Sequence, residues 1–493
     1  MSLRDLGAEL RRARRARRAR EARGEPAEEG GAVAPIAFDA RERPAAGPAS
    51  IDPVLNSTAA SSPTTDTPIS VDDAAVAARL ASLSSSHPAL ATRLRALDPE
   101  QRAAILAEGE SVLVEAQVGS GKTTVLAHRV LTLHLAEGVP LEEMAVLTFT
   151  RKAAREITDR VRGLLEAPPP PEAFAGFGTF HAVARSLLER SGRLDRFGRR
   201  PGFGVLDAAA RRALLLEIAR EAGLVLRYEK KLDRRLEAAR AGRWRYGAMR
   251  KDDDLPRLVA LYEEEKRRRN VFDFDDLVER ALEIVPELEP ERRPRWIVVD
   301  ELQDCDERQL AFLAAWAGEG TRFFGVGDPR QVIYSWRGSR PEIFAAFESR
   351  FGARRVTLAR NYRSRPAILA VAGAVLGAQA GPLRAAREGG RPVVVRRHHD
   401  PLAETVYLTA RIRALLEEGC APGEIAVLTR TREPLAALEE GLAAAGLPVA
   451  RRGVDREPER RELRDWLLRL LAAVLRPEDT GAAARLLADS AAA

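Results

Sequence analysis

Residues 111–124 read SVLVEAQVGSGKTT, and this stretch decides the fold. Its first half is a short run of apolar and β-branched residues, which predicts a buried strand. Its second half is rich in glycine and leads into VLAHRVLTLHL at 125–135, which has the apolar spacing of a helix. A strand, a glycine-rich turn and a helix N-terminus form the setting in which backbone N–H groups bind phosphate. We therefore predict a P-loop, although its first position is Ala116 instead of glycine.

The side chains of this loop have distinct expected tasks. Gly119 and Gly121 allow the backbone to approach the phosphates closely. Lys122 can reach the β- and γ-phosphates, and the hydroxyl of Thr123 can bind Mg²⁺. The predicted cofactors are therefore ATP and Mg²⁺, the alternative being a purely structural glycine turn. The predicted cofactor-binding positions of the loop are Gly119, Ser120, Gly121, Lys122, Thr123 and Thr124.

Two neighbouring carboxylates supply the second signal, in RWIVVDELQD at 295–304. The apolar run predicts a strand, whose carboxyl end carries Asp300 and Glu301 to the edge where ligands of open α/β sheets bind. Asp300 is the candidate Mg²⁺ ligand, and Glu301 is placed to orient or deprotonate the attacking water. An Asp-Glu pair after a strand can also be only a helix cap. With a P-loop upstream, we interpret it as the second half of a nucleoside triphosphatase site.

The order of the apolar runs predicts an α/β fold with a parallel sheet. Runs at 111–116, 144–150, 295–300 and 321–327 each precede a helical pattern. Short β-branched runs separated by amphipathic helices indicate strands joined by crossover helices. From 191 to 290 the sequence becomes charged and helical, which predicts a helical insertion into this α/β domain.

Further apolar runs predict a second α/β unit. They lie at 355–361, 391–397 and 423–431, so this unit is expected to start near Arg355. After about Arg451 the sequence is again charged and helical.

The first 88 residues have an unusual composition. Residues 1–24 are dense in arginine and favour a helix, either as a solvated tail or as an auxiliary phosphate-binding arm. Residues 25–88 are rich in Ala, Pro, Ser, Thr and Gly. Such a segment cannot bury enough apolar surface to offset the entropy lost on ordering, so we predict a disordered linker.

Composition narrows the class of protein. Hydrophobic residues make up 45% and charged residues 31%, which is typical of a soluble globular protein. No uncharged apolar run is long enough for a transmembrane helix, and the N-terminus lacks the apolar segment of a secretory signal. Cys305 and Cys420 cannot form a disulfide framework, so a cytoplasmic location is expected. The net charge of +7 favours polyanions but does not distinguish nucleic acid from another acidic partner.

Six motifs, in order, resemble those of superfamily-1A DNA helicases of the UvrD/Rep/PcrA type. They are LDPEQRAAI (97–105), AVLTFTRKAAREI (145–157), GTFHAVARSLL (178–188), DELQD (300–304), VGDPRQVIYSWRGS (326–339) and LARNYRSRPAIL (358–369). The resemblance implies tandem RecA-like domains, the first with a helical insertion. It also implies an ATP-dependent DNA helicase or translocase of 3′→5′ polarity that acts in DNA repair or recombination.

The resemblance assigns roles to matching positions. Gln101 would contact the adenine base, and Tyr362 would stack on it. Gln331 would sense the γ-phosphate, and Arg363 would stabilise transition-state charge as an arginine finger. The implied catalytic residues are Glu301, Lys122, Gln331 and Arg363.

Single-stranded DNA and its junctions with duplex DNA are the implied partners. Aromatic stacking suits a motor that reads no sequence, since it contributes roughly 1–3 kcal/mol per base whatever the base. Each aromatic residue could instead be a core position. The implied DNA-binding residues are Phe149, Thr150, Phe180, His181, Trp336 and Arg337.

Two departures from the family pattern stand out. Pro329-Arg330 replaces an acidic pair that is usual in UvrD-like proteins and is nearer to the RecB/AddA branch. No lysine follows Lys266 and no histidine follows His399, so the last two motifs of the second motor domain are expected to be absent. The chain would then be a fragment or an interrupted gene product, or a second polypeptide would supply the missing half.

Two alternative functions follow. One is a truncated or split helicase subunit that binds ATP and single-stranded DNA but needs a partner for unwinding. The other is a P-loop enzyme acting on a small molecule. The predicted domains are an arginine-rich segment (1–24), a linker (25–88), domain 1A (89–190 and 291–354), its insertion 1B (191–290), a partial domain 2A (355–450) and the start of a 2B-like region (451–493).

Overall fold

The computed structural model describes most of the chain between residues 73 and 450. The described residues are 73–107, 111–167, 169–226, 232, 236, 254–333, 339–377, 381, 383–447 and 449–450. Contacts divide the chain into two units, one of residues 60–393 and the other of residues 1–59 with 394–493. The arginine-rich segment and the predicted 2B-like region lie outside the described residues.

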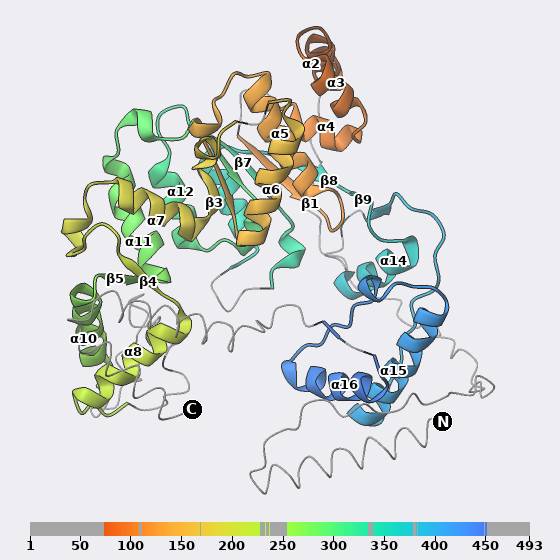
Figure 1. Ribbon diagram of the computed structural model, residues 1–493. Helices are drawn as coiled ribbons and strands as arrows, with labels where there is room; N and C mark the ends of the chain where they lie inside the picture. Colours follow the sequence, from red (N-terminus) through yellow and green to blue (C-terminus); the bar gives the residue numbers. More distant parts are fainter. Residues whose placement is uncertain are drawn as a thin grey trace, which may run out of the picture. The chain divides into compact units, whose positions relative to one another are not determined.

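A six-stranded parallel sheet forms the centre of the unit 60–393 (Figure 1). All neighbouring strands in it run parallel, as the alternation of apolar runs and helices predicted. In spatial order the strands are β3 (Phe177–Thr179), β2 (Met144–Thr148), β6 (Trp296–Val299), β7 (Arg322–Gly327), β1 (Val112–Ala116) and β8 (Arg354–Leu358).

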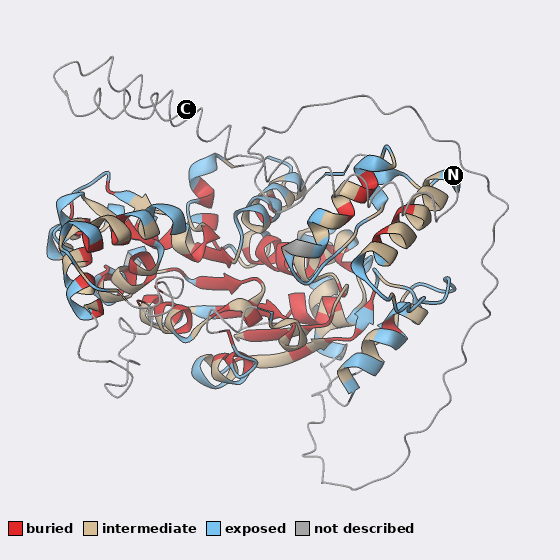
Figure 2. Ribbon diagram, turned by 90° about the horizontal axis from the view of Figure 1, so that it is seen from below, coloured by how far each residue is buried: buried red, intermediate tan, exposed pale blue. Residues whose placement is uncertain are grey.

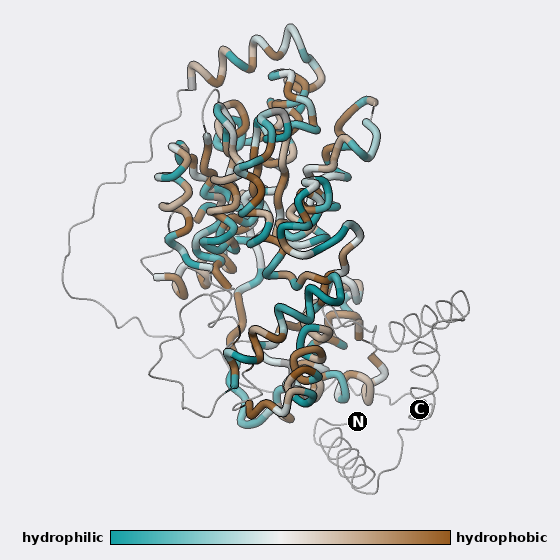
Figure 3. Tube along the Cα trace, turned by 90° about the vertical axis from the view of Figure 1, so that its left-hand side faces the viewer, coloured by the Kyte–Doolittle hydropathy of each residue, from teal (hydrophilic) through white to brown (hydrophobic). Residues whose placement is uncertain are grey.

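Helices cover both faces of this sheet, and its four inner strands are almost entirely buried (Figure 2). Alternate residues of β1 face opposite sides, because Val112 and Val114 belong to one core cluster and Leu113 to the other. The first cluster includes α3 (Pro88–Arg95), α4 (Pro99–Ile105), α5 (Lys122–Leu135) and α6 (Arg151–Leu164). The second includes α7 (Phe180–Arg190), α11 (Phe274–Ile284), α12 (Glu307–Trp316) and α13 (Ile343–Phe351). Hydrophobic and hydrophilic residues are interspersed along the chain (Figure 3).

The predicted disordered linker is wrong from residue 73 onward. Helix α2 (Asp73–Ser86) occupies the end of that segment. Its Val76, Leu80 and Leu83 recur at helical spacing and pack against the first core cluster. The alanine- and serine-rich composition concealed this narrow apolar stripe.

The insertion has a small core of its own. Strands β4 (Gly204–Leu206) and β5 (Val271–Asp273) pair in parallel, and α8 (Ala208–Glu221) and α10 (Leu255–Arg268) contribute to a separate apolar cluster. At its base Lys266 is fully buried, with its Nζ 2.6 Å from Asp276 Oδ2 and 3.4 Å from Asp273 Oδ2. Short 3₁₀ turns occur at Leu141–Glu143, Pro171–Phe174, Leu194–Phe197, Val285–Glu287, Pro290–Arg292, Leu302–Asp304, Pro329–Gln331 and Pro422–Glu424.

The strand expected to open the second α/β unit belongs instead to the first sheet. β8 pairs with β1 along its whole length, from Val112 opposite Arg354 to Ala116 opposite Leu358. The chain then forms β9 (Arg360–Asn361), α14 (Pro366–Leu376) and β10 (Arg384–Ala385), with β9 and β10 paired in parallel.

The described part of the other unit is helical. It contains α15 (Pro401–Glu417) and α16 (Arg432–Ala444), and no strand is assigned within residues 394–447. The strands predicted at 391–397 and 423–431 are therefore not formed here. Val395 is 83% exposed and Leu428 is 92% exposed, so these runs have neither the burial nor the ladder partners that a strand needs. No helix among the described residues is long and apolar enough to cross a membrane.

Candidate nucleotide-binding site

The P-loop has the predicted strand–turn–helix geometry. β1 ends at Ala116, and Gly119 and Gly121 adopt φ angles of 67° and 87°, which disfavour other residues. Helix α5 begins at Lys122 without a side-chain cap. Its first N–H groups therefore point toward the loop, where an anion can accept from them.

The two carboxylates after β6 lie beside this loop. Lys122 Nζ is 2.6 Å from Glu301 Oε2, which also accepts a 2.8 Å hydrogen bond from Gln303 Nε2. Glu301 has a φ of 49°, a left-handed conformation that turns the chain sharply at the sheet edge. Asp300 is nearly buried, and this burial raises its pKa to about 7, an effect to which the neighbouring Glu301 adds and which Lys122 opposes.

The residues present fit a triphosphate and a divalent cation. Asp300 Oδ1 and Ser120 Oγ are buried and accept or donate no hydrogen bond within the described chain. A buried oxygen without a partner is costly, so a site that supplies a cation or a phosphate explains both atoms. Mg²⁺ is commonly held by one or two protein oxygens together with substrate phosphates, and Thr123 and Asp300 are the candidates. The described residues contain no cluster of three or more His, Cys, Asp or Glu side chains suited to a metal, at this site or away from it.

A hydrogen-bonded chain links this site to the end of β7. Gln303 Oε1 accepts a 2.9 Å bond from the backbone N–H of Asp328. The Asp328 carboxylate in turn accepts a 2.9 Å bond from Gln331 Nε2. The chain thus runs from Lys122 through Glu301, Gln303 and Asp328 to Gln331, and it joins both predicted halves of the site.

Gln101 contacts the P-loop directly. Its Nε2 donates to the carbonyl oxygen of Ser120 at 2.8 Å, and its Oε1 accepts from the N–H of Asp98 at the start of α4. A Cβ built on Gly121 would lie 2.7 Å from Gln101 Nε2, so this glycine is required by close approach as well as by its φ. Gln101 therefore holds the loop's shape from the side of α4.

Asn361 was not predicted as a site residue, yet it joins the P-loop to the segment after β8. It is fully buried, its Nδ2 donates to Val118 O at 2.5 Å, and its Oδ1 accepts from the N–H groups of Arg363 and Ser364. Tyr362 N also donates to Gly119 O at 2.8 Å. The only sign in the sequence that Asn361 belongs to the site is its position between Arg360 and Tyr362, immediately after an apolar run.

Tyr362 and Arg363 lie next to the loop as expected. Desolvation raises the pKa of Tyr362 to about 12, and its hydrogen bond to Asp98 adds to the rise. Arg363 is exposed, and its Cβ is 2.8 Å from where a Cβ on Gly119 would lie. Gln101, Tyr362 and Arg363 thus all border the P-loop.

Comparison with known families agrees with this geometry. The family described as the UvrD/REP helicase N-terminal domain matches residues 97–352. The chain belongs to the UvrD/Rep helicase family. The family described as the UvrD-like helicase C-terminal domain matches residues 356–492. This second match does not support the prediction that the C-terminal motifs of the family are absent.

Several members of the UvrD/Rep family are similar in sequence. ATP-dependent DNA helicase UvrD1 of Mycobacterium tuberculosis is 32% identical over 404 residues, which cover 76% of this chain and 52% of the relative. DNA helicase II of Escherichia coli is 31% identical over 407 residues, covering 77% and 55%. ATP-dependent DNA helicase UvrD2 of M. tuberculosis is 31% identical over 414 residues, covering 76% and 57%. The chain spans about half the length of these curated relatives.

The residues that the UvrD/Rep resemblance assigned to DNA are placed unevenly. Phe149 is partly buried and Thr150 is exposed, both at the carboxyl end of β2, where Thr150 caps α6. Phe180 is only 2% exposed and lies in the second core cluster, so it is not available to stack on a base. His181 packs edge-on against Phe274 with ring centroids 5.3 Å apart. Trp336 and Arg337 lie outside the described residues.

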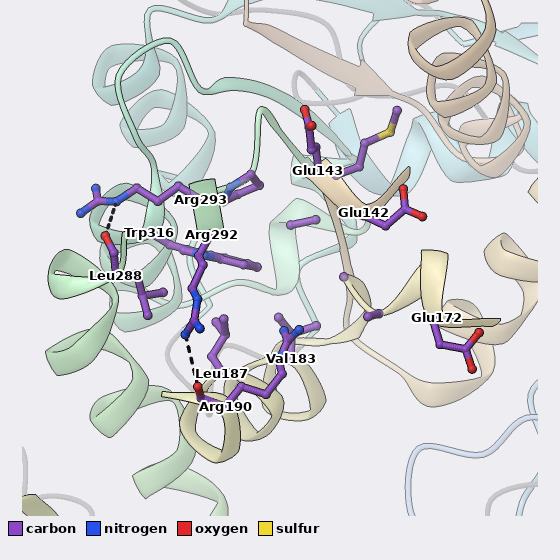
Figure 4. A pocket seen from close by; sticks show the side chains of 15 residues that line it. Glu142, Glu143, Glu172, Val183, Leu187, Arg190, Leu288, Arg292, Arg293 and Trp316 are labelled. Atoms are coloured by element: carbon purple, nitrogen blue, oxygen red, sulfur yellow. Dashed lines mark hydrogen bonds between the residues drawn. The ribbon is translucent and has the colours of Figure 1, made fainter. Parts of the chain in front are cut away.

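A separate hollow of about 600 Å³ opens at the amino ends of the strands, beside the first residues of β2 (Figure 4). Trp316 and Leu187 form part of its apolar floor, and Arg292 donates to the carbonyl oxygen of Arg190 at one side. Because β2 runs from this end of the sheet toward the P-loop end, the hollow lies away from the predicted nucleotide contacts.

Proposed function

We propose that the chain provides the ATP-hydrolysing and DNA-binding machinery of a 3′→5′ DNA helicase or single-stranded DNA translocase acting in DNA repair or recombination. The observation that carries this proposal is the contact between Lys122 and Glu301, with Gln303, Asp328 and Gln331 joined to it by hydrogen bonds. A structural glycine turn would not need a hydrogen-bonded set of polar groups, two of them buried, that connects three adjoining strand ends.

In this proposal the side chains divide the work. The P-loop N–H groups and Lys122 bind and orient the phosphates, while Glu301 accepts a proton from the attacking water. Gln331 and Arg363 approach the γ-phosphate from two sides, and Gln101 and Tyr362 hold the base. When bound, Mg²⁺ neutralises charge on the phosphate oxygens, with Thr123 and Asp300 as its protein ligands.

Single-stranded DNA and its junctions with duplex are the proposed partners. Phe149 and Thr150 support this, because they lie at the carboxyl edge of the sheet where the nucleotide residues also gather. The predicted stacking of Trp336 and contact of Arg337 remain predictions, as do the 1A, 1B and 2A boundaries. A cytoplasmic location is proposed on the two unpaired cysteines.

The second candidate function is a subunit that binds ATP and single-stranded DNA but needs another polypeptide for unwinding. The exposure of Ile368, Val371 and Val375 on α14 favours it, because such an apolar face usually packs against a partner. Both candidates share the nucleotide site, so they differ in turnover rather than in binding.

The test is ATP hydrolysis by the purified chain with and without single-stranded DNA at low salt, next to Lys122→Ala. DNA-stimulated turnover that Lys122→Ala abolishes supports the motor. Binding of ATP and DNA without turnover supports the subunit. Equal hydrolysis by Lys122→Ala would refute the placement of the site.

A further inference from the structure

Position 330 holds an arginine where the UvrD-like pattern has an acidic residue, and this arginine is tied into the sheet edge. Its Nη2 lies 2.8 Å from Glu115 Oε1, and its Nε lies 3.0 Å from Asp328 Oδ1. The side chain is only 15% exposed. Glu115 on β1 is paired in register with Gly327, the residue before Asp328. Arg330 therefore bridges carboxylates at the ends of two adjacent strands.

The bridged Asp328 controls the predicted γ-phosphate sensor. Its side chain is 3% exposed, and its second oxygen accepts the hydrogen bond from Gln331 Nε2. Its backbone N–H donates to Gln303, which donates in turn to Glu301. A shift of Asp328 would therefore move the amide of Gln331 and the hydrogen bond from Gln303 that orients Glu301, the predicted general base.

The surroundings of Arg330 extend this contact to the P-loop. Gln117, the second residue of the loop motif, is 1% exposed, and neither atom of its amide has a hydrogen-bond partner in the described chain. Gly381, with a φ of 62°, packs on both side chains. A Cβ added there would lie 2.7 Å from Arg330 Nη1 and 3.1 Å from Gln117 Nε2. The guanidinium thus lies where the P-loop, β7 and the segment after α14 meet.

We propose that Arg330 is a positioning residue for nucleotide hydrolysis, which holds Asp328 against Glu115 and so sets the orientation of the Gln331 amide. This inference rests on the proposed function. An acidic residue at position 330 would add a third carboxylate beside Glu115 and Asp328, which like-charge repulsion disfavours. The arginine at position 330 and the glutamate at position 115 therefore act together, and a planar guanidinium suits the task because it can bond two carboxylates at once.

The experiment compares Arg330→Ala with Arg355→Ala as the matched control. Arg355 also pairs with Glu115, at 3.3 Å, and with Glu348 at 2.6 Å, but it belongs to β8, which lies on the opposite side of β1 from β7 and Asp328. For each variant we would measure kcat and KM for ATP, the Kd values of ADP and of a non-hydrolysable ATP analogue, and the unfolding temperature. Arg330→Lys and Glu115→Gln are the conservative variants.

For Arg330→Ala we expect kcat to fall roughly tenfold to a hundredfold with KM within about twofold, because small displacements of a positioned group cost that much. The preference for the triphosphate analogue over ADP should also fall, since it depends on the sensor amide. For Arg330→Lys, kcat and the nucleotide preference should lie between those of the parent chain and those of Arg330→Ala. Arg355→Ala should keep both the kcat and the preference of the parent chain.

Three results would overturn the inference. The first is a kcat of Arg330→Ala within twofold of that of the parent chain. The second is an equal loss of kcat in Arg355→Ala. The third is a loss of kcat that is explained by a lowered unfolding temperature alone. The nucleotide preference tests the inference even if the chain turns over slowly. A parent chain that binds no nucleotide would refute the proposed function itself, and the inference with it.

Discussion

Replacing Glu301 by glutamine separates the two tasks that we propose for its carboxylate. These are accepting a proton from water and pairing with Lys122. In the structure its Oε2 both holds Lys122 Nζ at 2.6 Å and accepts from Gln303. Glutamine keeps the shape but removes the charge, so it cannot accept a proton from water. Hydrolysis should fall by about 10²- to 10⁴-fold, the usual contribution of a positioned general base.

Nucleotide binding should change in the opposite direction. The side chains of Lys122 and Glu301 are 13% and 35% exposed, so their ion pair is partly solvated and worth at most about 1 kcal/mol. A phosphate that recruits Lys122 must break this pair in the parent chain but not in the variant. Since 1.4 kcal/mol corresponds to about tenfold, Glu301→Gln should bind ATP up to about fivefold more tightly.

The assay is a fluorescence titration with a labelled ATP, followed by single-turnover hydrolysis. Glu156→Gln is the control, because Glu156 raises the pKa of Asp300 through its charge but pairs with Arg160 and not with Lys122. That control should leave affinity and turnover nearly unchanged. Weaker ATP binding by Glu301→Gln, or hydrolysis within tenfold of the parent, would refute the reasoning.

Three further predictions concern stability and DNA binding. Lys266→Met should lower the free energy of unfolding by about 3–5 kcal/mol, measured with urea, because it removes a fully buried cation that pairs with two buried carboxylates. Phe180→Ala should lower it by a similar 3–5 kcal/mol without a specific loss of single-strand affinity, whereas Phe149→Ala should lose affinity in a filter-binding assay and remain folded. Partial burial raises the pKa of Asp98, but hydrogen bonds from the Glu100 N–H, Tyr362 and Arg360 outweigh this effect and hold the pKa below its ordinary value. The stabilisation that Asp98 provides is therefore present above the ordinary pKa of an aspartate and is lost as the pH falls through the lowered one. Asp98→Asn should therefore make the free energy of unfolding fall less steeply as the pH is lowered. An unchanged pH dependence on the acid side would contradict this assignment.

The fold of the first sheet was predictable because its signals are local. The strand ending at Ala116, the glycines at 119 and 121 and the helix that starts at Lys122 occupy one continuous stretch, and each shows its own pattern. The same holds for the strand before Asp300. The apolar residues that indicate helix α2 were harder to recognise at 73–86, because alanine and serine dominate the composition there.

The strands predicted at 391–397 and 423–431 failed for a different reason. An apolar run such as RVTL indicates a strand but not its partner, and here β8 joins β1 across 242 positions of sequence, from Val112 to Arg354. The runs around Val395 and Leu428 have the same local pattern, yet they have no neighbouring strands among the described residues, and both residues are exposed. Strand pairing is a long-range interaction that local pattern cannot specify.

The sequence by itself determined which residues can carry the chemistry that we propose for this protein. A phosphate-binding loop and an Asp-Glu pair need particular atoms at particular spacings, and those atoms are written in the order of the residues. The tertiary structure decided which distant groups share an environment. It placed Arg330 between Glu115 and Asp328, bonded Asn361 to the P-loop, and buried Arg129 completely over the ring of Trp296 at 4.6 Å. Burial and charge pairing arise only when separate segments meet, so each of these roles became visible only in the folded chain.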